Sequence, residues 1–184
     1  MKTPLDAPTD TQERRILRDR ARVLALAPVT PPTDSELIQA LRFSLGAESY
    51  AVEARHVREV LPLPRVAPLP CVPSFVRGII NVRGRIISLL DLKTILGLPD
   101  SGLSPSSGVI ILQSPSMEFG LLADEIQGLA AIPLSSLQAA LPTLTGARAE
   151  YLKGVTAEGV VLLDAEKLLS NKKLVIDETA GETA

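Results

Sequence analysis

The sequence predicts a mainly β protein with two similar lobes, short helices and one additional helix near the N-terminus. Residues 78–96 are repeated in weaker form at residues 154–169: each copy has a β run, a glycine turn, a second β run and an aspartate that opens a short apolar helix. The β runs are short, rich in Ile and Val, and separated by turn residues. No segment between them is long enough for the helical crossovers of a parallel sheet, so the pattern favours a barrel or a sandwich.

The repeat extends upstream of each copy. Residues 42–57 and residues 109–126 share a strand, a tight turn, a strand led by an aromatic residue (Tyr50 or Phe119) and a short apolar tail. Between the two halves lies a stretch rich in proline, glycine and serine, residues 98–108, which predicts an exposed loop. The proline-rich segment after Leu61 predicts an extended connection with little capacity for helix or sheet pairing.

Composition excludes several classes of function. The 184 residues are 46% hydrophobic but only 3% aromatic, and 19 basic against 21 acidic residues give a net charge of −2. We therefore expect no nucleic-acid partner, since neither a basic field nor aromatic stacking platforms are available. No apolar run approaches the roughly 20 residues of a membrane helix, so no direct membrane insertion is expected. The one cysteine, Cys71, is expected to be a packed thiol in a protein of the reducing cytoplasm.

Three regions are predicted along the chain: an N-terminal extension over residues 1–35, a compact body over 36–176 and a polar tail over 177–184. The extension contains an amphipathic helix with an apolar stripe formed by Leu17, Ala21 and Leu24, followed by a proline-rich linker. The stripe can pack on the body of the protein or dock on a partner. We predict that it docks on an additional partner.

The sequence contains few residues in patterns typical of catalysis. His56, the single histidine, has no nucleophile or orienting partner in the pattern and is expected at the surface. One His and one Cys cannot form a soft-ligand metal site, and no cofactor motif is present, so neither a metal nor a cofactor is expected. A carboxylate-dependent enzyme using Asp91, Asp124 and Asp164 is the alternative. Asp91 and Asp164 precede helical patterns, however, which indicates helix capping.

Arg83 is the residue that most suggests recognition. It stands immediately before the turn glycine Gly84, where its side chain can project from a rigid strand end. Glu59, on a predicted short helix ahead of the proline-rich segment, is the carboxylate expected to pair with it. A guanidinium held in bidentate fashion by a carboxylate is oriented as well as charged, although ordinary surface pairs contribute little to stability.

Over residues 37–176 the chain resembles the CheW family, the coupling proteins of bacterial chemosensory arrays. The resemblance is carried, in order, by the opening strands that contain Phe43 and Tyr50, the segment 57–60, the segment 78–84 and the stretches that end at Asp124 and Asp164. It implies two five-stranded SH3-like β barrels around a shared hydrophobic core, without catalysis. Ser88 stands where the family often has proline, and the N-terminal helix exceeds the minimal family pattern.

The resemblance also implies the partners and the site. Family members connect the cytoplasmic tips of chemoreceptors to the regulatory domain of the histidine kinase CheA; a scaffold of a non-motility pathway is an alternative output. The candidate residues for receptor and kinase contact are Val57, Glu59, Asn81, Val82 and Arg83. Gly78 and Gly84 are the glycines expected at structural turns.

Overall fold

The computed structural model describes residues 37–100, 102–138 and 147–174. The predicted N-terminal helix, its linker and the C-terminal tail lie outside these residues, so the domain boundaries stay predictions. The first half of the described chain contains β1 (Leu37–Leu45), β2 (Glu48–Glu53), the 3-10 helix η2 (Ala54–His56), β3 (Val57–Pro62), β4 (Val76–Val82), β5 (Arg85–Asp91) and α2 (Leu92–Leu96). The second half contains β6 (Gly108–Gln113), β7 (Glu118–Ala123), β8 (Glu125–Pro133), η3 (Leu134–Ser136), β9 (Leu137–Gln138), α3 (Ala147–Tyr151), β10 (Leu152–Thr156), β11 (Val161–Leu163), α4 (Ala165–Ser170) and η4 (Lys172–Leu174).

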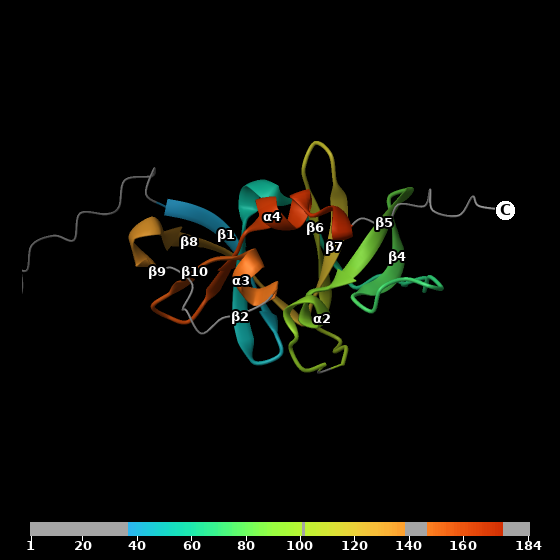
Figure 1. The fold of residues 1–184 in the computed structure, drawn as a ribbon, viewed down its shortest axis with the longest axis horizontal. Helices are drawn as coiled ribbons and strands as arrows, with labels where there is room; N and C mark the ends of the chain where they lie inside the picture. The colour runs from blue at the N-terminus through green and yellow to red at the C-terminus, as the bar shows by residue number, and fades with distance from the viewer. Residues whose placement is uncertain (1–36, 101, 139–146, 175–184) are drawn as a thin grey trace, which may run out of the picture. The chain divides into compact units, whose positions relative to one another are not determined.

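The strands form two mixed sheets. Sheet A has six strands in the order β8-β1-β2-β11-β10-β9, and sheet B has five in the order β3-β6-β7-β5-β4. All pairs are antiparallel except β2 with β11 and β5 with β7. Figure 1 shows β1, β8 and β10 on one side, β4, β5 and β7 on the other, and the short helices α3 and α4 between them. The predicted mainly β class is confirmed, but sheet A has one strand more than the expected five, because the two-residue β9 pairs with β10.

The two halves of the chain exchange strands. Sheet A takes β1 and β2 from the first half and β8 to β11 from the second; sheet B takes β3 to β5 from the first half and β6 and β7 from the second. Each parallel pair therefore joins strands from different halves. The sequence repeat is real, but each repeat contributes to both sheets instead of forming a lobe of its own (Figure 1).

The repeated helix starts behave as predicted. Asp91 accepts a hydrogen bond from the backbone N–H of Lys93 at the start of α2, and Asp164 accepts one from the backbone N–H of Lys167 at the start of α4. Such capping satisfies an N–H group that has no partner inside the helix. Loop residues 102–106 are exposed, as expected, and the proline-rich segment after β3 forms only the isolated bridge between Ala67 and Ile79.

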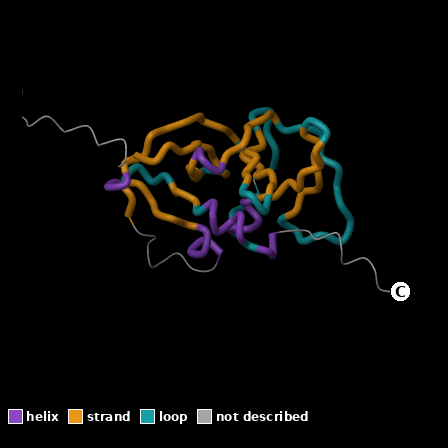
Figure 2. The backbone as a smooth tube through the Cα atoms, turned by 90° about the horizontal axis from the view of Figure 1, so that it is seen from above, coloured by secondary structure: helices purple, strands orange, loops and turns teal. Residues whose placement is uncertain are grey.

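The hydrophobic core is shared between the sheets. Its largest cluster combines Phe43 and Tyr50 of sheet A with Ile110 and Leu121 of sheet B, and it includes apolar residues of α2 and α4. Figure 2 shows a group of helices where the two groups of strands meet, with separate helical turns among the strands on the left. Two smaller clusters lie within sheet B and sheet A respectively. Because the main cluster needs side chains from both sheets, the sheets stabilise each other through hydrophobic burial.

Gly78 differs from its expected role. It lies inside β4, at an irregularity in the pairing with β5, and not in a turn. Its φ is +139°, and a Cβ added there would lie 2.2 Å from the carbonyl oxygen of Ala67. Glycine is required because the proline-rich segment crosses the strand closely at this point.

Among the described residues, no helix is long and apolar enough to cross a membrane.

Candidate partner-binding site

The segment that begins at Val57 is a strand, not the predicted short helix. The 3-10 helix η2 ends at His56, and β3 then pairs antiparallel with β6, with Val60 opposite Ile110. β-branched Val57 and Val60 favour the pleated backbone of a strand. Along β3, Val57 and Glu59 are half-buried, whereas Arg58 and Val60 are exposed. The alternation turns Glu59 toward neighbouring strands, where it can meet cationic side chains.

Arg83 lies in a tight turn that constrains its backbone. Val82 of β4 pairs with Arg85 of β5, so Arg83 and Gly84 form a two-residue hairpin loop. Their φ angles are +52° and +85°, and positive values at both positions are those of a type I′ turn. Asn81 fixes the turn, because its side-chain oxygen Oδ1 accepts a hydrogen bond of 2.8 Å from the Gly84 N–H. A non-glycine residue in this region is strained, which makes Arg83 a candidate for function.

The expected pair between Arg83 and Glu59 is present, but it is part of a larger network. Arg83 Nη2 lies 3.3 Å from Glu59 Oε2, and Arg85 Nη2 lies 3.2 Å from Glu59 Oε1. Arg85 Nη1 also donates to both carboxylate oxygens of Glu118, at 2.6 and 2.5 Å. Arg58 Nη1 reaches Glu118 Oε1 at 3.1 Å. We call these five side chains the arginine–glutamate network.

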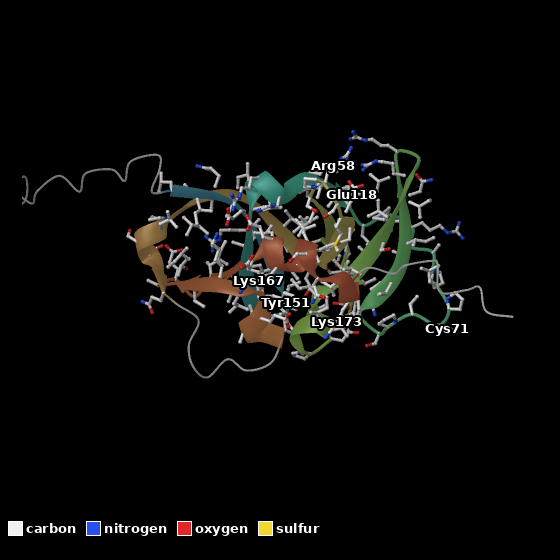
Figure 3. All side chains as sticks on the ribbon, turned by 45° about the horizontal axis from the view of Figure 1, so that its top comes forward. Arg58, Cys71, Glu118, Tyr151, Lys167 and Lys173 are labelled. Atoms are coloured by element: carbon white, nitrogen blue, oxygen red, sulfur yellow. The ribbon has the colours of Figure 1, made fainter. Side chains whose placement is uncertain are left out.

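The two glutamate side chains of the network are mostly shielded from solvent, whereas the Arg83 side chain is exposed. The Glu59 side chain is 19% exposed and that of Arg83 is 83% exposed. Arg83 is therefore held on one side by a single carboxylate oxygen, in contrast to the expected bidentate grip. Figure 3 shows Arg58 and Glu118 lying next to each other. A partner would meet the Arg83 guanidinium first, because it is the most exposed member.

Sequence reasoning missed Arg85 and Glu118. Both occupy the first positions of strands, β5 and β7, which lie side by side in sheet B and run parallel. A signal was present in the sequence, since Arg85 follows the turn glycine directly. Choosing Glu118 as its partner, however, requires the knowledge that β5 and β7 are neighbours.

The remaining candidate residues have structural roles beside the site. Val82 is 4% exposed and belongs to the core cluster of sheet B, so its side chain is not available to a partner in this structure. Val57 packs against the shared core. Asn81 holds the turn. Of the expected contact residues, Glu59 and Arg83 are brought together directly, whereas Asn81 and Val82 fix the hairpin that presents Arg83.

A second ionic cluster connects β2, η2, β10 and α4. Arg55 contacts Glu53 at 2.7 Å and Glu166 at 3.0 Å, and Lys153 donates to Glu53. Burial acts to raise the pKa of the Glu53 carboxyl, but the hydrogen bond and charge of Lys153 and the charge of Arg55 outweigh it and hold that pKa below its ordinary value. His56, expected at the surface, is half-buried, with Nε2 3.7 Å from Glu166 Oε1. Cys71, expected to be packed, is exposed in the proline-rich segment (Figure 3).

The three aspartates of the enzyme alternative have separate structural tasks. Asp91 and Asp164 cap helices, and Asp124 bonds to the buried amine of Lys93 at 2.8 Å. Within the described part of the chain, no group of three or more His, Cys, Asp or Glu side chains is arranged to hold a metal ion. The arrangement supports binding, through a constrained hairpin and an organised set of charges.

Comparison with known proteins agrees with a binding role. The sequence matches the CheW-like domain family over residues 39–173. The chemotaxis protein CheW of Treponema pallidum is 32% identical over 148 residues, which cover 77% of this chain and 87% of that protein. Protein PilI of Pseudomonas aeruginosa is 32% identical over 127 residues, covering 67% and 71%. The crystal structure of the scaffolding protein TtCheW from Thermoanaerobacter tengcongensis superposes with a TM-score of 0.64 at 27% identity, over 70% of this chain and 89% of that one.

The fold and these similarities thus define a scaffolding module built of two SH3-like barrels. The chain belongs to the CheW-like domain family. It is a chemotaxis coupling adaptor, and neither the carboxylate-dependent enzyme nor the non-motility scaffold is favoured.

Proposed function

We propose that this adaptor connects the cytoplasmic tips of chemoreceptors to the regulatory domain of a CheA-type histidine kinase, on the cytoplasmic side of a receptor array. The match to the CheW-like domain family and the similarity to the scaffolding protein TtCheW support this pair of partners. We assign the receptor-facing surface to the β4–β5 hairpin and the adjacent strand β3. Its contact residues are Arg83 and Glu59, with Val57, Asn81 and Val82 as structural support.

The presentation of Arg83 carries this proposal. Its side chain is the most exposed in the arginine–glutamate network, yet the turn fixes its backbone and Glu59 Oε2 holds its guanidinium. A planar guanidinium forms paired hydrogen bonds to a carboxylate, so a partner's acidic side chain suits this group. Pre-organisation reduces the entropy lost when the complex forms.

The direct test is the variant Arg83→Ala. We expect its affinity for a soluble chemoreceptor cytoplasmic fragment to fall by about tenfold, because a charge-assisted bond contributes roughly 1.5–3 kcal/mol. Its melting temperature should hardly change, because exposed ion pairs contribute about 0–1 kcal/mol to stability. Arg65→Ala, which removes an exposed arginine from the proline-rich segment, is the matched control. An unchanged affinity for Arg83→Ala would remove this hairpin from the receptor surface.

The variant Arg83→Gly separates binding from backbone strain. Glycine adopts positive φ without steric conflict, so we expect this variant to be more stable than Arg83→Ala by about 1 kcal/mol. Both variants should bind the receptor fragment equally weakly, since both lack the guanidinium. The measurement is urea denaturation combined with titration calorimetry. If Arg83→Gly were the less stable of the two, the strain assigned to this turn would be wrong.

A further inference from the structure

Arg85 connects two carboxylates that lie on different strands. Nη2 contacts Glu59 of β3 at 3.2 Å, while Nη1 donates to both oxygens of Glu118 of β7 at 2.6 and 2.5 Å. Arg85 itself is on β5, so one side chain joins three strands of sheet B. A guanidinium can do this because its donors form a rigid, planar fork; a lysine amine lacks that geometry.

The bridge decides how Glu59 is shared. Arg85 occupies Oε1 of Glu59, which leaves Oε2 for Arg83 at 3.3 Å. Arg85 is in turn drawn toward Glu118, where its contacts are shorter, and Arg58 shares the same carboxylate at 3.1 Å. Moving any member would change the position of its neighbour, since each carboxylate serves two arginines.

The network also carries an unbalanced charge. Three arginines and two glutamates give 3 − 2 = +1, and the most exposed cation is Arg83. The inner members are partly shielded from water, which strengthens their interaction relative to that of isolated surface pairs. The positive charge left over is therefore presented at the hairpin tip, next to a carboxylate that already has another partner.

We propose that Arg85 and Glu118 are positioning residues for receptor recognition: they fix Glu59 so that Arg83 is held by one oxygen and stays open to an acidic side chain of the partner. This inference rests on the proposed function of the hairpin. It assigns a role to two residues that do not themselves have to touch the receptor. Ordinary surface ion pairs would instead act independently of one another.

A double-mutant cycle between Glu118 and Arg83 tests this role. The variants are Glu118→Gln, Arg83→Ala and the two combined, with binding to the same chemoreceptor fragment as readout. We expect Glu118→Gln to weaken binding by about three- to tenfold when Arg83 is present and to have no further effect when it is absent, since residues in one network are coupled. Because Glu118→Gln removes a negative charge beside the site, weaker binding in this variant would report lost positioning and not lost electrostatic attraction.

A second variant and a control keep the test decisive. Arg85→Lys keeps the charge but loses the fork, and it should weaken binding to a similar extent. Arg42→Lys is the control, because the Arg42 side chain on β1 of sheet A is, like that of Arg85, 33% exposed. Melting temperatures measured in parallel report loss of folding.

The outcomes distinguish the two proposals. If Arg83→Ala leaves binding unchanged, the proposed receptor surface fails. If Arg83→Ala weakens binding but Glu118→Gln has no effect, or has the same effect with and without Arg83, the surface stands and the positioning role is wrong. The same holds if Arg85→Lys binds like the unmodified protein.

Discussion

At the scale of single residues, Lys93 is, with Asp91, one of the two most deeply buried charged side chains among the described residues. Its side chain is 2% exposed, and Nζ lies 2.8 Å from Asp124 Oδ1 and 3.3 Å from the carbonyl oxygen of Gly102. Asp124 also accepts a hydrogen bond of 2.6 Å from the Gly46 N–H in the β1–β2 turn. The Lys93–Asp124 pair therefore links α2, which follows strand β5 of sheet B, to the β1–β2 turn of sheet A.

Removing the Lys93 amine should be strongly destabilising. We expect Lys93→Met to lower the free energy of unfolding by about 3 kcal/mol, because one partner of a buried ion pair is left without its counter-ion. Adding Asp124→Asn should recover part of that loss. Lys173→Met, at an exposed lysine, should stay within about 0.5 kcal/mol of the unmodified protein. Urea denaturation measures all of these values. If Lys93→Met lowered the free energy of unfolding by less than Lys173→Met does, the Lys93–Asp124 pair would not be a stabilising element.

Glu53 should make stability depend on pH. Its folded-state pKa is lowered from an ordinary value of 4.5, so its ionised form stabilises the fold above that pH, and this contribution is lost as the pH falls through the folded-state pKa. Glu53→Gln should reduce stability near neutral pH, and its difference from the unmodified protein should shrink as the pH falls below 4.5. Glu158→Gln, at a side chain that is 79% exposed, is the control. A difference that stays constant from neutral to acid pH would contradict the lowered pKa.

At the scale of elements, the hairpin of β4 and β5 contains two glycines with different roles. A Cβ at Gly78 would clash with the Ala67 carbonyl oxygen at 2.2 Å, whereas a Cβ at Gly84 would meet nothing within 4 Å. We expect Gly84→Ala to cost about 1–2 kcal/mol from its left-handed backbone alone. Gly78→Ala should cost clearly more, because the backbone of the proline-rich segment must move. Thermal and urea denaturation of both variants check this order, and equal losses would contradict it.

The sequence was a good guide to these elements and a poor guide to their partners. Turn glycines, β-branched runs and capping aspartates act over a few residues, so the repeated strands and the caps at Asp91 and Asp164 could be predicted. Residues 57–60 are predicted to be helical but lie in strand β3, because four residues, two of them charged, next to the 3-10 helix Ala54–His56 have no decisive periodicity. Glu118 could not be found, because its contact with Arg85 depends on strand order.

At the scale of the whole molecule, strand exchange binds the halves of the chain into one folding unit. Sheet A lacks β1 and β2 without the first half, and sheet B lacks β6 and β7 without the second. Local patterns could not predict this, since hydrophobic alternation states which face of a strand is buried but not which strand lies beside it. The parallel pairs β2–β11 and β5–β7 connect segments far apart in sequence, a topology associated with slower folding.

This arrangement predicts that neither half folds alone. Fragments 1–102 and 103–184, divided within the exposed loop, should each lack a cooperative unfolding transition, because each would leave both sheets incomplete and the shared cluster around Phe43 and Ile110 half open to water. When mixed, they should recover the circular dichroism of the intact chain. An intact chain cleaved after folding at a protease site in the same loop is the control, and it should stay folded.

In the intact chain, native-state hydrogen exchange should show β2 and β6 losing protection at the same urea concentration. A fragment with its own cooperative transition, or protection lost separately in the two sheets, would mean that the sheets are independent domains.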